Sequence, residues 1–432
     1  MVKSSLARPL LPLANLLSQK DILSVSLKPK WKLHHLRQLN DYARQSLADG
    51  YYDASGESSK IYKLHNLNGR NVLVGVGDSG IDWKSTYFYD PDHSVKRAES
   101  GSSDHRKISL YVPLFGKDET STDGHGTHVC GTIAGKAYDS SNSSDALYNG
   151  IAEEAKLLFV DLEDSDEDLY LPKDLYNRYY MKTLYRNKAR INSNSWGSEE
   201  DYEYDSFCSQ TDKFVWDYND MLILFAAGNE GEEGLGSVTS PALSKNVITV
   251  GATHSERNHD GKNYITYFSS RGNPNKRTIK PDIVAPGDQF SAKSLSRWDC
   301  GLNCDNHGGV VKMQGTSMAT PAVAGIVALI TQYLKEKSYH NQELDVRASL
   351  IKAMVVHSGQ PTTGYCNIIM RCFPHNKNHF YYEGHGRVQL DRVLHYDGES
   401  DFELFLYYGQ INEKKESFTL EFTITNISLE IQ

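Results

Sequence analysis

The stretch from Gly315 to Ile330 constrains the fold more than any other part of the chain. It begins Gly-Thr-Ser-Met-Ala-Thr-Pro and continues as an uncharged run of small and apolar residues. Such a run predicts a helix that is buried on all sides, with other layers packed around it. Thr316 and Ser317 are residues typical of helix starts, and Pro321 is tolerated near one. We therefore expect Ser317 at the mouth of a core helix, where free backbone N–H groups favour a developing anion.

Four apolar segments alternate with segments of helical character. They lie at residues 72–76, 157–162, 221–226 and 247–252. Strands that alternate with helices predict an α/β fold with a doubly wound, mainly parallel sheet and helices on both faces. The texture changes after residue 395, and at 418–425 apolar and polar residues alternate with period two, which predicts strands.

Bulk properties argue against two classes of protein. The 432 residues carry a net charge of −9 without a Lys/Arg cluster, which argues against nucleic-acid binding. No run of 18 apolar residues occurs, so we expect no transmembrane segment in this chain. Arg8, Pro9 and Pro12 interrupt the N-terminal apolar residues, so no clear signal peptide is recognised.

Three polar residues lie beside glycines at the expected ends of strands or helices. Asp78 lies in the turn after the first predicted strand, His125 stands between two glycines in the first turn of a predicted small-residue helix, and Ser317 opens the core helix. Taken singly, each is explained as a turn or cap residue. Together they meet the needs of a serine nucleophile, which requires a base to take its proton and an acid to orient that base. We predict a catalytic set of Asp78, His125 and Ser317.

Asn229 supplies the remaining requirement of acyl-transfer chemistry. It follows a buried strand within Ala-Ala-Gly-Asn, and its amide can donate to an oxyanion together with the backbone N–H of Ser317. His125 and His128 could instead ligate a metal, but no third ligand stands at helical spacing. Cys130 lies among small apolar residues and is interpreted as a buried free thiol.

These motifs, in the order Asp, His, Ser, resemble those of subtilisin-like serine proteases, the subtilase family. The resemblance covers about residues 70–395 and includes Ser269-Ser270-Arg271-Gly272 and the Lys-Pro-Asp segment from Lys280. It implies a serine endopeptidase that hydrolyses peptide bonds through an acyl-enzyme intermediate, with polypeptides as substrates. It also implies substrate-binding residues that pair with or flank an extended substrate; these are Ser195, Trp196, Gly197, Gly228 and Glu230.

The resemblance suggests a division of the chain into parts. Residues 1–50 resemble part of an inhibitory prosegment, 51–70 form a linker, and 71–395 form the catalytic domain. Residues 396–432 resemble the start of the β-sandwich that follows the catalytic domain in larger subtilases, so both flanks are expected to be incomplete. Two alternatives stay open for the function: a catalytically silent binding or regulatory module, and the protease part of a transporter-fused protein.

No cofactor is required for the expected chemistry. Subtilases often bind structural calcium, but no calcium loop is recognised here, so the metal content is unknown. The family resemblance favours an extracellular or secretory location. Two closely spaced cysteine pairs, Cys300/Cys304 and Cys366/Cys372, suit small-loop disulfides, with zinc as the rival interpretation.

The acidic stretch at 163–168 has two interpretations. If these carboxylates and Glu230 face the substrate groove, they favour Lys or Arg in the substrate. If they do not, they form a solvated surface loop, which is the usual role of such a run.

Overall fold

The computed structural model shows where most of the expected domain lies. It describes residues 31–33 and 65–406, apart from 115–123, 139–142, 147, 165–168, 172–175, 200, 256–260, 274–277, 296–308, 337–338, 341–343, 376–378, 398–399 and 401. The prosegment-like region, except for 31–33, and the alternating pattern at 418–425 therefore lie outside the described residues. So do Cys300 and Cys304.

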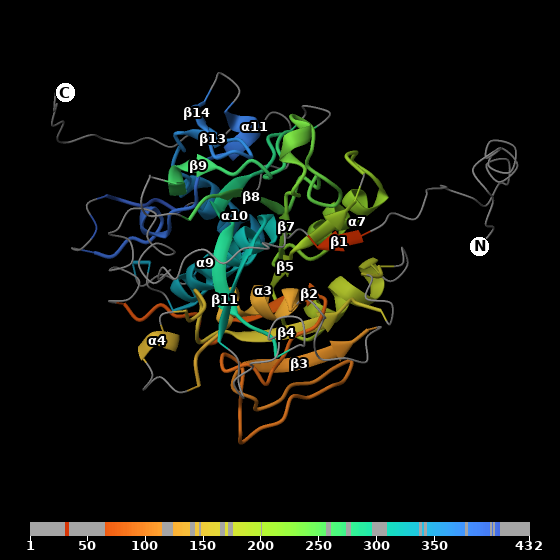
Figure 1. Ribbon diagram of the computed structural model, residues 1–432. Helices are drawn as coiled ribbons and strands as arrows, with labels where there is room; N and C mark the ends of the chain where they lie inside the picture. The colour runs from red at the N-terminus through yellow and green to blue at the C-terminus, as the bar shows by residue number, and fades with distance from the viewer. Residues whose placement is uncertain are drawn as a thin grey trace, which may run out of the picture.

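The centre of the molecule is a 10-stranded sheet whose middle strands are parallel. These follow one another across the sheet in the order β3, β4, β2, β5, β7, β8, from the lower to the upper part of Figure 1. Their bounds are β2 Leu73–Asp78, β3 Ile108–Pro113, β4 Lys156–Asp161, β5 Ile191–Asn194, β7 Leu222–Ala226 and β8 Ile248–Thr253. The doubly wound, mainly parallel sheet expected from the sequence is confirmed.

Shorter strands extend the sheet and flank it. β10 (Ile283–Pro286) pairs parallel with β8, and the edge beyond β8 carries β9 (Tyr264–Ile265), β13 (Gly364–Cys366) and β14 (Cys372–Pro374). Two further pairs lie outside this sheet: β11 (Asp288–Ala292) with β12 (Val310–Gln314), and β1 (Trp31–Leu33) with β6 (Trp196–Ser198).

Helices cover both faces of the sheet because successive side chains of a strand point to opposite sides. On β4, Leu157 and Phe159 belong to one apolar cluster, while Leu158 and Val160 belong to the other. The first cluster includes residues of α3 (His125–Ala134), α9 (Thr316–Lys335) and α10 (Ala348–His357). The second includes residues of η2 (Tyr176–Met181), α6 (Lys182–Arg186) and α7 (Ser206–Asp217). The remaining short helices are α4 Ser143–Ala146, η3 Gly231–Glu233, η4 Gly261–Asn263, α11 Phe380–Glu383 and η5 Leu390–Arg392.

Helix α9 is the buried core helix that the sequence predicts. Every residue from Thr316 to Leu334 except Ile326 is buried, and α9 packs against α3 and the central strands. By length and composition alone, among the described residues, α9 could cross a membrane. However, 94% of its apolar window is buried inside the fold, as expected for a core helix.

Residues 65–70, which the sequence pattern assigns to the linker, pack against the end of α9. The side-chain carbonyl of Gln332 accepts the backbone N–H groups of Asn68 (2.9 Å) and Gly69 (2.7 Å). Leu67 is buried in the first apolar cluster. A polar, glycine-containing stretch can thus belong to the folded unit when a buried amide satisfies its backbone.

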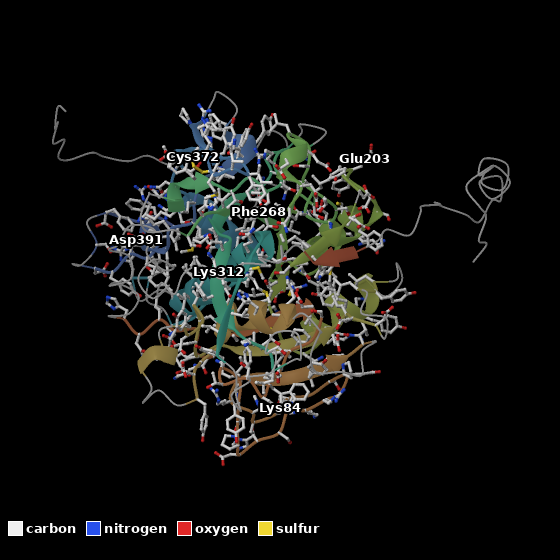
Figure 2. The ribbon with its side chains drawn as sticks, viewed as in Figure 1. Lys84, Glu203, Phe268, Lys312, Cys372 and Asp391 are labelled. Atoms are coloured by element: carbon white, nitrogen blue, oxygen red, sulfur yellow. A yellow bond between two sulfur atoms is a disulfide. The ribbon has the colours of Figure 1, made fainter. Side chains whose placement is uncertain are left out.

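The four cysteines among the described residues form one disulfide and two buried free thiols. Cys366 and Cys372 form a disulfide between β13 and β14, which confirms the small-loop bridge and excludes zinc for this pair. In Figure 2, Cys372 lies at the upper end of the molecule, opposite Lys84. Cys130 is a buried free thiol, as expected, and Cys208 is a second one.

Candidate active site

Asp78 and His125 meet in the interior of the molecule. Asp78 ends β2 and His125 begins α3; His125 Nδ1 and Asp78 Oδ1 are 2.7 Å apart, and both side chains are fully buried. Gly124 precedes the helix in the left-handed region (φ 68°), which glycine adopts without steric cost. A Cβ at Gly126 would lie 2.1 Å from the carbonyl oxygen of Gly80, so only glycine permits this approach of α3 to the β2 turn.

Ser317 is the second residue of α9 and is held by a reciprocal pair of hydrogen bonds. Its hydroxyl donates to the Ser195 carbonyl at 2.7 Å, and the Ser195 hydroxyl donates to the Ser317 carbonyl at 2.9 Å. Pro321, four residues on, has no N–H to offer that carbonyl as a normal helical residue would. Ser195 therefore replaces a missing helix hydrogen bond directly at the candidate nucleophile.

The starts of α3 and α9 are joined by one buried residue, Gln289. The backbone carbonyl of Gln289 lies 3.2 Å from His128 Nε2, and the Gln289 side-chain amide donates to the Met318 carbonyl at 3.0 Å. His128 is one turn after His125, and Met318 directly follows Ser317. Because the carbonyl of Gln289 can only accept, His128 donates through Nε2 in this network.

Asn229 is oriented by the residue before Ser317. Its side-chain oxygen accepts the Thr316 backbone N–H at 3.0 Å and the Thr316 hydroxyl at 3.1 Å. The backbone N–H is only a donor, so the amide atom facing it must be the oxygen, and the NH₂ group occupies the other branch. Gly228, at φ 112°, makes the turn from β7 that brings Asn229 to the start of α9.

The segment expected to pair with substrate already pairs with another strand. In β6, Trp196 and Gly197 are opposite Leu33 and Lys32 of β1 in antiparallel register. The Trp196 side chain itself is fully buried, and its indole N–H donates to the Gly77 carbonyl at 2.9 Å. The backbone of Trp196 thus pairs with an extended segment, whereas its ring belongs to the core.

Glu230 and the acidic stretch at 163–168 are the other residues expected to influence substrate specificity. Glu230 is partly buried, and its backbone N–H lies 3.0 Å from the Ser270 hydroxyl. Of the acidic stretch at 163–168, only Glu163 and Asp164 are among the described residues. The two interpretations of this stretch therefore both remain predictions.

Asp161 is a buried carboxyl beside the candidate site that the sequence reasoning missed. It ends β4 in register with Asp78 and accepts a hydrogen bond from the Tyr111 hydroxyl at 2.7 Å. Burial, aided by the charge of Asp78, raises the pKa of Asp161 to about 6. The sequence feature that could have identified Asp161 is its place at the end of a parallel strand, at the same sheet edge as Asp78.

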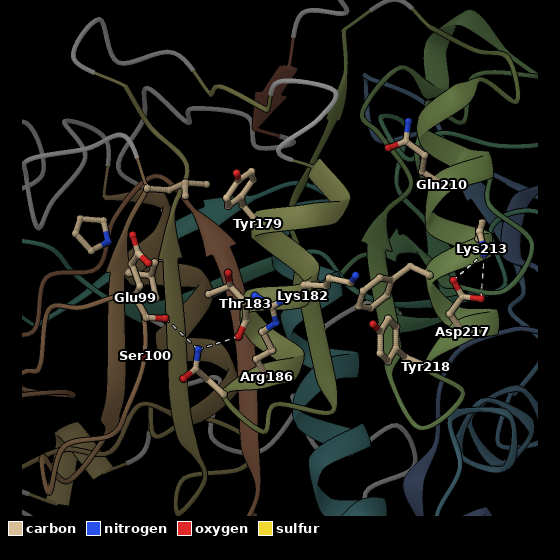
Figure 3. Close-up of a pocket in the computed structure, with 15 residues that line it drawn as sticks. Glu99, Ser100, Tyr179, Lys182, Thr183, Arg186, Gln210, Lys213, Asp217 and Tyr218 are labelled. Carbon is tan, nitrogen blue, oxygen red and sulfur yellow. Dashed lines mark hydrogen bonds and ion pairs between the residues drawn. The ribbon is translucent and has the colours of Figure 1, made fainter. Parts of the chain in front are cut away.

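A separate cavity of about 940 Å³ lies between α6 and α7 and is shown in Figure 3. Its wall carries both charge signs, including Lys182, Arg186 and a Lys213–Asp217 ion pair of 2.8 Å. Asp78, His125, Asn229 and Ser317 are not among its 15 lining residues, so this cavity is distinct from the candidate active site.

Comparison with known proteins gives consistent matches. A family model described as the subtilase family matches residues 69–380. "Serine protease/ABC transporter B family protein tagD" of Dictyostelium discoideum is 28% identical over 384 residues, covering 69% of this chain and 21% of that protein. Serine protease AprX of Bacillus subtilis is 29% identical over 299 residues, covering 67% and 63%. The fervidolysin structure from Fervidobacterium pennivorans superposes with a TM-score of 0.53 at 20% identity, covering 85% of this chain and 51% of that one. The chain spans about a fifth or less of the length of the first three curated relatives it matches.

Proposed function

Because the chain belongs to the subtilase family, we propose that it is a serine endopeptidase with Ser317 as nucleophile, His125 as general base and Asp78 as the residue that orients the base. The observation that carries this proposal is the buried 2.7 Å contact between His125 Nδ1 and Asp78 Oδ1. A carboxylate at Nδ1 holds the imidazole in the tautomer whose Nε2 can accept a proton, and it stabilises the imidazolium that follows.

The proposed reaction begins when the Ser317 hydroxyl leaves the Ser195 carbonyl and attacks a peptide carbonyl carbon. The new O–C bond forms as the proton moves to His125 Nε2. The tetrahedral oxyanion accepts hydrogen bonds from the Asn229 NH₂ group and the Ser317 backbone N–H. The C–N bond then breaks, His125 protonates the leaving amine, and water repeats the sequence to release the acid.

The substrate in this proposal is an extended polypeptide that adds a strand to β6. Support comes from the antiparallel pairing of β1 with β6, which places a piece of the chain's own N-terminal region on the expected substrate strand. A segment bound there competes with substrate, so the N-terminal region is proposed to act as an inhibitory prosegment.

The proposal also covers the full-length protein, a C-terminal domain, the location and the cofactors. Relatives named as serine protease/ABC transporter proteins match this chain over 69% of its length, which favours the protease portion of a transporter-fused protein over a silent module. The period-two pattern at 418–425 supports a C-terminal β-sandwich, and family membership supports a secreted location. The reaction needs no cofactor, and a structural calcium ion is compatible with the family.

Peptide hydrolysis by purified protein tests this function. A quenched fluorescent peptide should be cleaved by the wild-type chain, with the new termini identified by mass spectrometry. Ser317→Ala and Asp78→Asn should each lower kcat by about 10⁴-fold or more while leaving the thermal unfolding temperature near that of wild type. Hydrolysis that persists in Ser317→Ala would assign the activity to another group, and a folded but inactive wild type would favour the silent module.

A further inference from the structure

A second group of metal-ligating side chains lies at the far end of α9. His340 follows that helix, while His395, Asp397 and Glu403 come from the segment after η5, on the side of the molecule marked by Asp391 in Figure 2. We propose that His340, His395 and Asp397 form a zinc-binding site, with water completing the coordination and Glu403 beside it. The ligand atoms of His340, His395 and Asp397 all lie within 4.8 Å of one another.

The separations suit a small tetrahedral ion. His340 Nδ1 is 2.7 Å and His395 Nε2 is 3.2 Å from Asp397 Oδ1, and His395 Nε2 is 3.7 Å from Glu403 Oε2. Zinc bonds of about 2.0–2.1 Å to nitrogen and oxygen place neighbouring tetrahedral ligands about 3.3 Å apart. The His395–Asp397 separation is close to that value, and a shift of about half an ångström brings the His340–Asp397 pair to it.

His395 has the tautomer that a metal ligand needs. Its Nδ1 lies 2.8 Å from the Phe402 carbonyl, which can only accept, so Nδ1 carries the proton. In the neutral ring, Nε2 then presents its lone pair toward Asp397 and Glu403. A backbone carbonyl on the other ring nitrogen is the usual support for a histidine ligand. The ring is 4% exposed and therefore fixed in this orientation.

The backbone on both sides of the group is also held in place. The Tyr333 hydroxyl donates to the His395 carbonyl at 2.6 Å and accepts the His395 N–H at 3.1 Å. The hydroxyl of Tyr339, beside His340, donates to the Leu404 carbonyl at 2.7 Å, one residue from Glu403. These bonds bring the two ligand-bearing segments together without any ion, so the site is preorganised.

The ligand types select among metals. Two imidazoles with carboxylates suit zinc, whereas calcium and magnesium prefer oxygen ligands alone. A second group, His375, His379 and Glu383, is the natural comparison. There the nitrogen–oxygen separations are 3.7 and 4.0 Å, and His375 Nε2 already lies 2.6 Å from the Thr362 hydroxyl. That group is therefore better explained as a hydrogen-bonded cluster.

The position of the site points to a structural role. Ser317 and Lys335 stand at opposite ends of a 20-residue helix, which is about 30 Å long. An ion bound beyond Lys335 is remote from the chemistry and would tie the end of the core helix to the segment at 395–406. Metal binding should thus stabilise the domain where the chain leaves it, without entering the reaction.

Zinc titration of metal-free protein tests the proposal. The full chain carrying Ser317→Ala, which prevents self-cleavage, is stripped with chelator and titrated with zinc sulfate against a chromophoric zinc indicator. We expect one zinc ion per chain, a rise in unfolding temperature, and intense visible absorption when cobalt replaces zinc. His340→Gln, His395→Gln and Asp397→Asn should each weaken zinc binding by about 100-fold or more, whereas the control His379→Gln should leave it unchanged.

The variants differ in how strongly they are expected to disturb folding. His395 is buried, but Asp397 is 67% exposed, so Asp397→Asn should fold normally and isolates the loss of a ligand. Failure of the parent protein to bind zinc, or zinc affinity unchanged in Asp397→Asn, would overturn the proposal. Loss of binding in His379→Gln, with the other variants unaffected, would also overturn it by moving the site to the second group.

Discussion

Replacing Gly126 with alanine should separate catalysis from stability. Gly126 follows His125 in the first turn of α3, and a Cβ there would lie 2.1 Å from the Gly80 carbonyl oxygen and 3.1 Å from Asp78 Oδ1. One obstacle belongs to the last residue of β2 and the other to the turn that follows it, and the nearer one is backbone. The added methyl group must therefore push the start of α3 away from the residue with which His125 pairs.

The size of the effect follows from the overlap. Relief of a 2.1 Å contact to an ordinary separation needs a displacement of about 1 Å, and a misplacement of that size costs about 100-fold in rate. Overpacking adds about 1–3 kcal/mol of lost stability. Gly325→Ala is the matched control for stability, because its Cβ would lie 2.6 Å from Ile151 Cβ but touches no candidate catalytic group. Gly309→Ala, with nothing within 4 Å, should be neutral.

The assay measures kcat/KM on a fluorogenic peptide and the free energy of unfolding in urea for all three variants. We expect Gly126→Ala and Gly325→Ala to lose similar stability, but only Gly126→Ala to lose about 100-fold in kcat/KM. Equal activity in these two variants, at equal folded fraction, would refute the reasoning that the close approach at Gly126 positions His125.

Three further substitutions probe the surrounding network. Asn229→Ala should lower kcat by about 10²–10³-fold with little change in KM, as measured by steady-state kinetics, because its amide acts on the developing charge. Ser195→Ala leaves the Ser317 carbonyl without its 2.9 Å donor and should cost about 1–3 kcal/mol in urea unfolding. Asp161 has its pKa raised from 3.8 to about 6, so its folded form holds a proton more tightly than its unfolded form. Its contribution to the free energy of unfolding is therefore present below pH 4, and about 3 kcal/mol is lost as the pH rises through 6. Asp161→Asn should remove this pH dependence, as measured by unfolding free energies at pH 4.5 and 7.5.

Much of the fold and of the candidate site can be predicted from local sequence patterns. The apolar run after Ser317 identified the core helix because burial on all sides leaves a composition signal within one element. Asp78, His125 and Asn229 are predicted as site residues from a local pattern too, since each stands beside glycines where an element begins or ends. Subtilase membership, inferred from these motifs, is confirmed by the family match over residues 69–380.

Contacts between distant parts of the chain could not be predicted from the sequence. Pairing of β1 with β6 joins residues from opposite ends of a long sequence interval, and nothing in Trp31–Leu33 indicates its partner. The motif predicts that the backbone of Trp196 pairs with substrate, which stays a prediction, but it does not indicate that the ring is buried and donates its N–H to the Gly77 carbonyl. Asp161 was missed because a lone carboxylate after a strand carries no signal until Asp78 lies beside it.

Covalent labelling with a fluorophosphonate probe tests the central claim most directly, because the probe reacts only with a serine activated by its surroundings. The wild-type chain should be labelled at one residue, located by tandem mass spectrometry at Ser317, and the Ser317→Ala variant should not be labelled. His125→Ala should slow the labelling strongly while Ser317 remains in place. Labelling at another serine, or labelling that survives Ser317→Ala, would contradict the assignment of Ser317 as the nucleophile.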